Sequence, residues 1–405
     1  MSRIVMKFGG TSVADLERIR NVAQRVKRER DAGHEVAVVV SAMAGVTNQL
    51  VAWCQNLAQL HDAREYDAVV ATGEQVTAGL TAIALQEIGV EARSWQGWQI
   101  PLRTDDAHGR ARIETIEGHD LVGRMQRGQV AVVCGFQGIG PDNRVTTLGR
   151  GGSDTSAVAL AAALRADRCD IYTDVDGVYT TDPRIVPRAR KLDKIAYEEM
   201  LELASVGAKV LQTRSVELAM KERVRVQVLS SFEDRPGTLV VDEDEIVEKE
   251  IVSGIAYSRE EAKITVRHVP DRPGIAAAIF GPLSAGGINV DMIVQNLGAD
   301  GLTDMTFTVP RADLPRVRAV LDENKGAIGF SEVLADSDVA KISVVGVGMR
   351  SHAGVANTMF SALAARGINI QVISTSEIKV SVLIGAEYTE LAVRALHTAY
   401  GLDAT

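Results

Sequence analysis

The stretch from Thr146 to Ser156, TTLGRGGSDTS, gathers residue types that bind anions. Six consecutive positions hold three glycines, the guanidinium of Arg150, the hydroxyl of Ser153 and the carboxylate of Asp154, and an alanine-rich apolar run follows. Glycines let the backbone approach a ligand closely, a helix N-terminus adds partial positive charge, and Arg grips a carboxylate through two parallel hydrogen bonds. A tight turn capped by Ser153 or Asp154 explains the same pattern. This stretch alone therefore leaves both interpretations open.

A lysine interrupts the first apolar strand of the chain. Ile4 to Phe8 reads as a short strand that contains Lys7, and Gly9 and Gly10 follow it directly. An edge lysine that reaches water is the common fate of such a residue, whereas a buried ammonium needs a partner. Because Lys7 stands beside a glycine turn at the start of a helix, we predict that it is a phosphate ligand.

Two further features lie where strands end or helices begin. Val36 to Val40 is a β-branched run typical of a buried parallel strand, and a loop of small residues, Ser41 to Thr47, follows it. Ligands of open α/β sheets bind at this edge. Glu74 stands early in an apolar helix. Its position alone favours a solvated acid near the helix N-terminus, and an acceptor for a substrate ammonium is the alternative.

A cluster of carboxylates follows the next predicted strand. Residues 170–179, DIYTDVDGVY, predict a strand that ends at Thr173 and Asp174. The carboxylates beside its turn indicate either Asx-turn scaffolding or proximity to a hydrated Mg²⁺. The DPR sequence at 182–184 predicts a rigid, charged turn that could meet a nucleotide, and Lys209 lies in a further predicted helix.

Alternating strands and helices indicate that a mainly parallel sheet, covered on both faces, positions these loops. The sequence lacks the Walker A and GxGxxG patterns, so a nucleotide would be held by another arrangement. At 405 residues the chain predicts two or three domains. The acidic run at 242–250 predicts an exposed linker after the first of them.

The C-terminal third contains an internal repeat. The segments that begin at Pro273 and Ala353 match at an offset of 80 residues, and Gly-Ile-Asn at 287–289 recurs at 367–369. Each copy predicts a strand, a turn, a helix and two more strands, which is a small ferredoxin-like module present twice. Neither copy carries a nucleophile–base pair, so regulation is favoured over catalysis there.

The amino-acid composition excludes some classes of protein. Apolar residues make up 46% and charged residues 24% of the chain, and the net charge is -9. This charge argues against a nucleic-acid partner. Cys54, Cys134 and Cys169 lack metal-ligand spacing and are expected to be buried free thiols in a reducing cytosol. The N-terminus lacks a signal-peptide pattern and we predict that no apolar run is long enough for a membrane span, so we expect a cytoplasmic protein without a membrane partner.

With these motifs in view, the whole chain resembles the aspartokinase family. The matching motifs are KFGGTS at 7–12, VVVSAMAGVTN at 38–48, TGEQ at 72–75, TTLGRGGSDTSA at 146–157 and YTDVDGVYTTDPR at 172–184, and the C-terminal repeats resemble ACT domains. The resemblance implies an α/β fold: an amino-acid-kinase-like three-layer α/β/α sandwich with a mainly parallel sheet, then two ferredoxin-like (βαββαβ) ACT domains. The expected boundaries are 1–245 for the catalytic domain, 246–262 for a linker, and 263–335 and 336–405 for the ACT domains.

The resemblance also implies a reaction, the transfer of a phosphoryl group from MgATP to the side-chain carboxylate of L-aspartate. Mg²⁺ would arrive with ATP and have no protein site of its own. Lys7 and Asp154 would be catalytic. The residues implied to bind aspartate are Thr47, Glu74, Arg150, Gly151, Gly152 and Ser153. The residues implied to bind ATP are Lys7, Phe8, Gly9, Gly10, Ser41, Thr173, Asp174, Tyr179, Thr180, Asp182, Pro183, Arg184 and Lys209.

For the ACT repeats the resemblance implies feedback inhibition by lysine, threonine or both, and a homo-oligomer. The implied effector residues are Asp271, Gly274, Asn289, Val290, Asp291, Gln295, Gly354, Asn369, Ile370, Ser376 and Glu377. The first repeat has DRPG at its turn and the second has SHAG. Whether the two repeats bind the effector equally is therefore left open. Val252 to Tyr257 could complete the second module if the repeats interleave.

Three rival interpretations remain at this point. Another amino-acid-kinase-like enzyme, such as an acetylglutamate or uridylate kinase, is disfavoured by Glu74 and Arg150, which suit an α-amino acid. A catalytically silent amino-acid sensor is disfavoured by the presence of Lys7 and Asp154. An ACT-bearing dehydrogenase is disfavoured because the dinucleotide fingerprint is missing.

Overall fold

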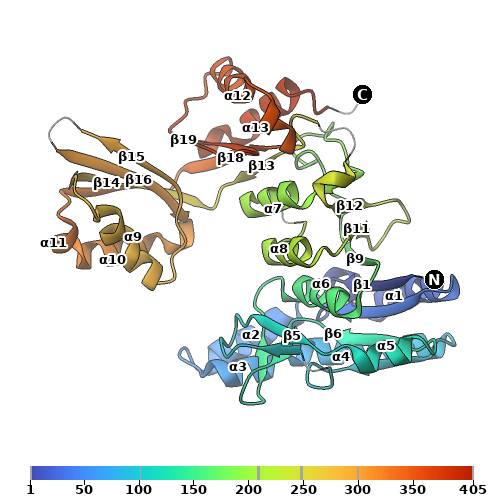
Figure 1. Ribbon diagram of the computed structural model, residues 1–405. Coiled ribbons are helices and arrows are strands. Elements are labelled where there is room, and N and C mark those ends of the chain that lie inside the picture. The colour runs from blue at the N-terminus through green and yellow to red at the C-terminus, as the bar shows by residue number, and fades with distance from the viewer. Residues whose placement is uncertain (1, 101, 208–209, 247–249, 299–300, 404–405) are drawn as a thin grey trace. The chain divides into compact units, whose positions relative to one another are not determined.

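The computed structural model describes residues 2–100, 102–207, 210–246, 250–298 and 301–403 (Figure 1). Its backbone contacts form two compact units. The first comprises Met1–Val178, Lys191–Ala204 and Lys209–Glu248, and the second comprises Tyr179–Arg190, Ser205–Ala208 and Lys249–Thr405. The expected catalytic boundary at 245 is close to the end of the first unit, but residues 179–190 and 205–208 group with the second.

The first unit is built on an eight-stranded sheet in the order β10-β12-β11-β9-β1-β2-β6-β3. All of its neighbouring strands are parallel except β11 and β12. The strands are β1 (Arg3–Phe8), β2 (Glu35–Val40), β3 (Ala92–Trp95), β6 (Val130–Cys134), β9 (Arg168–Thr173), β10 (Lys194–Ala196), β11 (Val226–Ser230) and β12 (Thr238–Val241). The parallel sheet confirms the predicted fold class.

A smaller sheet and helices α1 to α8 complete this unit, although the last two residues of α7 group with the second unit. The small sheet has the order β5-β4-β7-β8, with β4 (Leu102–Thr104), β5 (Ile113–Ile116), β7 (Gln137–Ile139) and β8 (Val145–Thr147). The helices are α1 (Leu16–Asp31), α2 (Val46–Leu57), α3 (Ala63–Val70), α4 (Thr72–Glu87), α5 (His119–Met125), α6 (Gly152–Leu164), α7 (Tyr197–Val206) and α8 (Thr213–Glu222). Helix α3 was not predicted, because its eight residues carry too short an apolar pattern.

Side chains of β1 and β2 alternate between two cores. Ile4, Met6 and Phe8 of β1 join one apolar cluster with residues of α1 and α4. The intervening residues, which include Lys7, face the opposite side, because successive strand side chains point to opposite faces. Helix α6 packs against β1. The sheet is therefore covered on both faces, as the continuous apolar strands predict.

Residues Ala63–Glu87, which span α3 and α4, form a 25-residue stretch long and apolar enough to cross a membrane by length and composition. This corrects the expectation that no apolar run reaches that length. Ala78, Ala82 and Leu85 of α4 belong to the core cluster, and α4 packs against α1 and β3. This packing of α4 is typical of a core helix.

The three cysteines are free. Cys134 and Cys169 are buried, as expected, whereas Cys54 is only half-buried. The difference arises because Cys54 lies on α2, a helix with no buried residue. Burial raises the pKa of the Cys134 and Cys169 thiols, so both stay protonated and unreactive at neutral pH.

The second unit contains two four-stranded antiparallel sheets. One has the order β15-β16-β14-β17, with β14 (Glu261–Pro270), β15 (Asp291–Leu297), β16 (Leu302–Pro310) and β17 (Glu332–Asp336). The other has the order β13-β18-β20-β19, with β13 (Gly254–Ser258), β18 (Val339–Val345), β19 (Val372–Thr375) and β20 (Lys379–Gly385). Their helices are α9 (Ile275–Ala285), α10 (Leu314–Glu323), α11 (Lys325–Ile328), α12 (Val355–Ala364) and α13 (Thr389–Ala399).

The two repeats interleave. β13 pairs with β18, so a strand that precedes the first repeat completes the sheet of the second. The expected linker at 246–262 is therefore corrected, since β13 and the start of β14 lie within it. The possibility that Val252 to Tyr257 completes the second module was left open by the sequence, and the pairing of β13 with β18 bears it out.

Candidate active site

Lys7 and Asp154 form an ion pair across the sheet–helix boundary. The Nζ atom of Lys7 on β1 lies 2.5 Å from Oδ1 of Asp154 in the first turn of α6. Each residue is 8% exposed. The buried ammonium thus has the partner that its burial requires.

Helix α6 holds Ser153 and Asp154 in place. Gly151 precedes it in the left-handed region at φ 73°, and a Cβ there would lie 2.0 Å from Cγ of Gln212. Only glycine fits this position. Ten consecutive residues of α6, from Gly152 to Ala161, are buried, and the helix packs against β1 and α8. The loop before α6 is therefore anchored at its C-terminal end.

Loops that follow four parallel strands meet at one edge of the sheet. The Ser41 N–H donates to Phe8 O, Gly135 N–H to Val40 O, and Gly9 N–H to Tyr172 O. These contacts join the ends of β1, β2, β6 and β9. The carboxyl ends of parallel strands are where α/β proteins bind ligands, so the predicted glycine and small-residue loops share one edge.

Two glycines let these loops approach one another. A Cβ on Gly10 would lie 3.0 Å from Ala42 O, and a Cβ on Gly135 would lie 2.8 Å from Cβ of Ser153. A side chain at Gly135 would push α6 away from the strand edge. Gly135 was not among the predicted site residues, although its place directly after a buried strand is a usable signal.

Glu74 is buried rather than solvated. It lies in the first turn of α4, is 3% exposed, and its Oε1 accepts a hydrogen bond of 3.0 Å from Ala42 N–H. Its Oε2 is buried without a hydrogen-bond partner among the described residues. Burial raises the pKa of Glu74 to about 7, although the Ala42 N–H opposes the shift. The expectation from position alone was wrong, because Gly73 and Glu74 lie on the buried face of the first turn of α4.

The other residues implied to bind aspartate are less constrained. Arg150 is exposed, and its guanidinium has no hydrogen bond or ion pair to the part of the chain that the structure describes. Thr47 is half-buried at the start of α2, and Gly151 and Gly152 lie at the start of α6.

Part of the predicted nucleotide set lies at the same strand edge. Gly9, Gly10 and Ser41 follow β1 and β2, and Thr173 ends β9, where its hydroxyl donates to Asp174. The ring of Phe8, in contrast, is buried and stacks on Tyr172 with centroids 4.6 Å apart, so only its backbone can meet a ligand. Lys209 lies outside the described residues.

The predicted nucleotide residues after 178 belong to the second unit. Thr180 is fully buried, and its hydroxyl hydrogen-bonds to Nε2 of His397 at 2.9 Å and accepts from Arg190 N–H. Asp182 pairs with the exposed Arg184, which lowers the pKa of that carboxyl. Tyr179 is half-buried and Pro183 is exposed. The roles of Tyr179, Thr180, Asp182, Pro183 and Arg184 stay predictions.

The predicted effector residues occupy equivalent places in the two repeats. Gly274 and Gly354 precede α9 and α12 with φ 90° and 96°, and Asn289 and Asn369 are both exposed. The other residues of the set divide between the half-buried Val290 and Ile370 and the exposed Asp271, Asp291, Gln295, Ser376 and Glu377.

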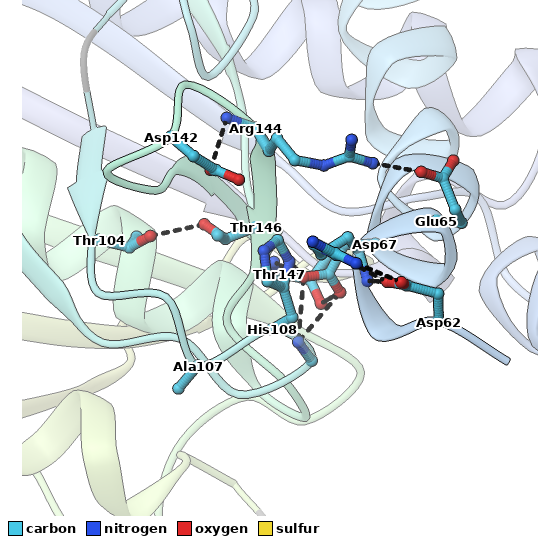
Figure 2. A network of polar contacts seen from close by, with 12 residues as sticks. Asp62, Glu65, Asp67, Thr104, Ala107, His108, Asp142, Arg144, Thr146 and Thr147 are labelled. Atoms are coloured by element: carbon cyan, nitrogen blue, oxygen red, sulfur yellow. Dashed lines mark hydrogen bonds and ion pairs between the residues drawn. The ribbon is translucent and has the colours of Figure 1, made fainter. Parts of the chain in front are cut away.

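A polar network beside the site was missed at the sequence level. Asp67 of α3 is fully buried and accepts hydrogen bonds from His108, Gly109 and Thr147 (Figure 2). Arg214 of α8 donates to Leu148 O at 2.9 Å. Isolated polar residues of this kind show no periodicity. The sequence held one weak indication that Asp67 is buried. Asp67 and the apolar Val70 are three residues apart and therefore lie on the same face of the helix.

No group of three or more His, Cys, Asp or Glu side chains within the described ranges is placed to hold a metal ion. Carboxylates near the strand edge, at Asp154 and Asp174, fit a hydrated Mg²⁺ that is bound mainly by phosphate oxygens.

Comparison with known proteins agrees with this architecture. The model of the amino acid kinase family matches residues 2–230, and ACT domain models match residues 264–326 and 342–400. An aspartate kinase from Pseudomonas putida is 56% identical over 405 residues, which cover 100% of this chain and 98% of that protein.

Two solved structures are also similar. Aspartokinase III of E. coli in complex with aspartate and ADP has a TM-score of 0.83 at 29% identity, over 98% of this chain and 99% of that one. The same enzyme in complex with lysine and aspartate has a TM-score of 0.77 at 29% identity, over 98% of both chains. The chain therefore belongs to the aspartokinase family, with an amino acid kinase catalytic region and two ACT domains.

Proposed function

We propose that Lys7, Asp154, Glu74 and Arg150 carry out aspartate phosphorylation in this chain. The family reaction transfers the γ-phosphoryl group of ATP to the side-chain carboxylate of L-aspartate and gives 4-phospho-L-aspartate, the first step towards lysine, threonine and methionine. The observation that carries the assignment is Glu74, a buried carboxylate with one unpartnered oxygen. It contacts Ala42 in the loop that packs on the glycine turn after Lys7.

The proposed chemistry requires positioning and charge neutralisation and no base. A carboxylate with a pKa of about 3.9 is ionised at neutral pH and is already a nucleophile. Its oxygen forms a bond to the γ-phosphorus, the bond to the β–γ bridging oxygen breaks, and the electron pair leaves with ADP. Lys7 would stabilise the charge on the transferring group, and Asp154 holds the Lys7 ammonium at 2.5 Å. MgATP supplies the metal, which neutralises phosphate charge when bound.

The substrate amino acid would be recognised at both ends. Glu74 suits the α-ammonium, because an ammonium would satisfy its unpartnered Oε2. Arg150 suits the α-carboxylate, and Ser153, Thr47 and the backbone of Gly151 and Gly152 would complete the pocket. Gly9, Gly10, Ser41, Thr173 and Asp174 would contact the nucleotide. Acetylglutamate and uridylate lack a free α-ammonium, so neither substrate offers a cation that Glu74 could bind. Glu74 therefore disfavours these two rival kinases.

For the ACT pair we propose feedback control by lysine, threonine or both, in a cytoplasmic homo-oligomer. Support comes from the E. coli enzyme, whose structure contains lysine. The exposed polar residues beside Gly274 and Gly354 would bind the effector, with Asp271 in the first repeat and no equivalent acid in the second, where Ser351 stands.

The experiment that tests this function is ATP-dependent formation of an acyl phosphate from L-aspartate, trapped with hydroxylamine, with and without lysine plus threonine. We expect trapped product that decreases when both effectors are added. If the amount of product did not decrease, the kinase activity would be supported and lysine and threonine would be rejected as effectors. If aspartate gave no product while ATP still bound, acetylglutamate and uridylate would be the next substrates to test.

A further inference from the structure

Asp67 is a buried carboxylate with both oxygens in use. It lies in α3, is 0% exposed, and receives hydrogen bonds from four donors. His108 Nδ1 donates at 2.7 Å, Gly109 N–H is 3.0 Å from Oδ2, Thr147 N–H donates at 3.0 Å, and the Thr147 hydroxyl donates at 2.5 Å. Because a carboxylate only accepts, Nδ1 of His108 carries the proton. Figure 2 shows Thr147 and His108 converging on this one side chain.

These donors belong to two segments that border the Arg150 loop, defined here as residues 148–152. Thr147 is the last residue of β8 and directly precedes the loop. His108 and Gly109 belong to the segment 105–112, which packs on the loop so closely that a Cβ at Gly149 would lie 3.0 Å from Gly109 O. Asp67 thus clamps the entrance of the loop to the segment beside it.

A second clamp acts on the same two segments. The guanidinium of Arg214 in α8 donates to Leu148 O at 2.9 Å and to Ala111 O at 2.7 Å. The exit of the loop is anchored separately by the buried helix α6. The loop backbone is therefore held at both ends, while the Arg150 side chain at its middle is exposed.

We propose that Asp67 and His108 are positioning residues that place Arg150 for the α-carboxylate of aspartate. The inference rests on the proposed role of Arg150. Bidentate binding by a guanidinium demands a defined backbone position, and small displacements of a binding group are costly. The buried network sets that position by hydrogen bonds to the Thr147 backbone, so its loss weakens aspartate binding and leaves the phosphate side, built on β1 and β2, unchanged.

The test measures steady-state kinetics of Asp67→Asn, His108→Ala and His108→Asn in the full chain. Asp67→Asn keeps the shape but turns an NH₂ group towards N–H donors, and we expect the KM for aspartate to rise about tenfold or more. His108→Ala should raise this KM by about threefold to tenfold, because one charge-assisted bond is lost. In His108→Asn the amide restores a donor near the Nδ1 position, so the KM should return towards wild type. The KM for ATP should stay unchanged in all three.

Glu65→Gln is the matched control. Glu65 lies in α3 near Asp67, but it forms an ion pair with Arg144 in which its side chain is 71% exposed. This substitution should change neither KM. If Glu65→Gln raised the KM for aspartate as much as Asp67→Asn does, the proposal would be overturned.

The outcomes separate this inference from the proposed function. Wild-type enzyme without aspartate kinase activity would reject the function. An active wild type together with variants that lose only thermal stability, or whose two KM values rise together, would show a merely structural network and overturn the inference. If Asp67→Asn fails to fold, the difference between His108→Ala and His108→Asn decides: equal KM values for aspartate in these two variants would reject the positioning role.

Discussion

Two buried charged side chains, Glu74 in the first unit and Lys341 in the second, have opposite surroundings. Glu74 is 3% exposed and keeps one oxygen without a partner among the described residues. Lys341 is 5% exposed, and its Nζ lies 3.1 Å from Oε1 of Glu261 and 2.9 Å from Oδ2 of Asp291. Burial alone would lower the pKa of Lys341, but the two carboxylates outweigh it and raise that pKa.

The difference lies in whether the buried charge is neutralised within the protein. Burial raises the pKa of Glu74 to about 7 because nothing neutralises its charge, so a cationic ligand gains by binding there. Lys341 of β18 is already neutralised by Glu261 of β14 and Asp291 of β15, and it joins the sheets of the two ACT repeats. Of these two side chains, Glu74 has an oxygen that a ligand could still engage, whereas Lys341 already connects two strands.

This contrast also bears on Asp291, which the sequence assigns to effector binding. Burial would raise its pKa, but Lys341 lowers it, so the carboxylate is ionised and engaged. If an effector binds Asp291 as proposed, it would have to compete with Lys341 for this carboxylate.

The largest expected effect concerns the first unit. Lys7→Ala should lower kcat by about a thousandfold or more, since the group that stabilises the transferred phosphoryl is lost. Folding should persist, as judged by circular dichroism. Lys27→Ala is the control, because Lys27 is partly exposed and pairs with Asp31 on the same helix. Full activity in Lys7→Ala would remove Lys7 from the mechanism.

The next effect tests the unpartnered oxygen. Glu74→Gln should raise the KM for aspartate by about a hundredfold, because a charge-assisted bond to the ammonium is lost. The same substitution should leave the ligand-free protein as stable or more stable above pH 7, since a buried charge is removed. Denaturation with and without aspartate measures this. A KM equal to that of wild type would mean that Glu74 does not contact the substrate.

The pKa of about 7 for Glu74 makes both properties depend on pH. Because the folded pKa lies above the unfolded value, this group favours the folded ligand-free state below about pH 4.5 and loses that contribution as pH rises through about 7. Aspartate affinity has the opposite slope, since only ionised Glu74 binds an ammonium, and kcat/KM for aspartate should fall as pH drops below about 7. Glu74→Gln should flatten both profiles, and profiles unchanged by it would assign the titration to another group.

A smaller effect is expected in the second unit. Lys341→Met leaves Glu261 partly buried without its cation, and we expect a loss of about 2 kcal/mol of stability. Activity without effector should remain, while the inhibition curve shifts, because the two sheets are no longer tied at this point. Arg267→Met is the comparison, since Arg267 lies on β14, the strand of Glu261, and pairs at 2.7 Å with Glu332 of β17 in the same sheet. Equal losses in both variants would contradict a special role for Lys341.

The smallest effect on stability distinguishes the two repeats. Asp271→Ala removes an exposed carboxylate and should leave the Tm within about one degree, yet relieve feedback inhibition. Ser351→Ala, at the equivalent place in the second repeat, should change inhibition much less. Inhibition curves for lysine and for threonine measure the difference. Identical curves for wild type and Asp271→Ala would refute this placement of the effector.

Local patterns were sufficient for much of the fold and of the site. The β-branched run at 36–40 predicted a buried parallel strand, and β2 is that strand. The 80-residue repeat predicted two similar modules because each repeats the same glycines, which adopt φ 68° at both Gly287 and Gly367. The family resemblance implied that Lys7 and Asp154 act together at the catalytic site, and the two form an ion pair.

The features that only the tertiary structure decided involve single residues, or strands that are far apart in the chain. The sequence by itself determined the order of the domains and the loops of the catalytic edge, since these follow from periodicity and glycine placement. It left open whether β13 completes the second ACT sheet, and it could not show that Glu74 is buried or that Asp67 meets His108 and Thr147. A lone polar residue has no period, and its partners lie 41 and 80 positions away. Only folding brings such donors and acceptors together.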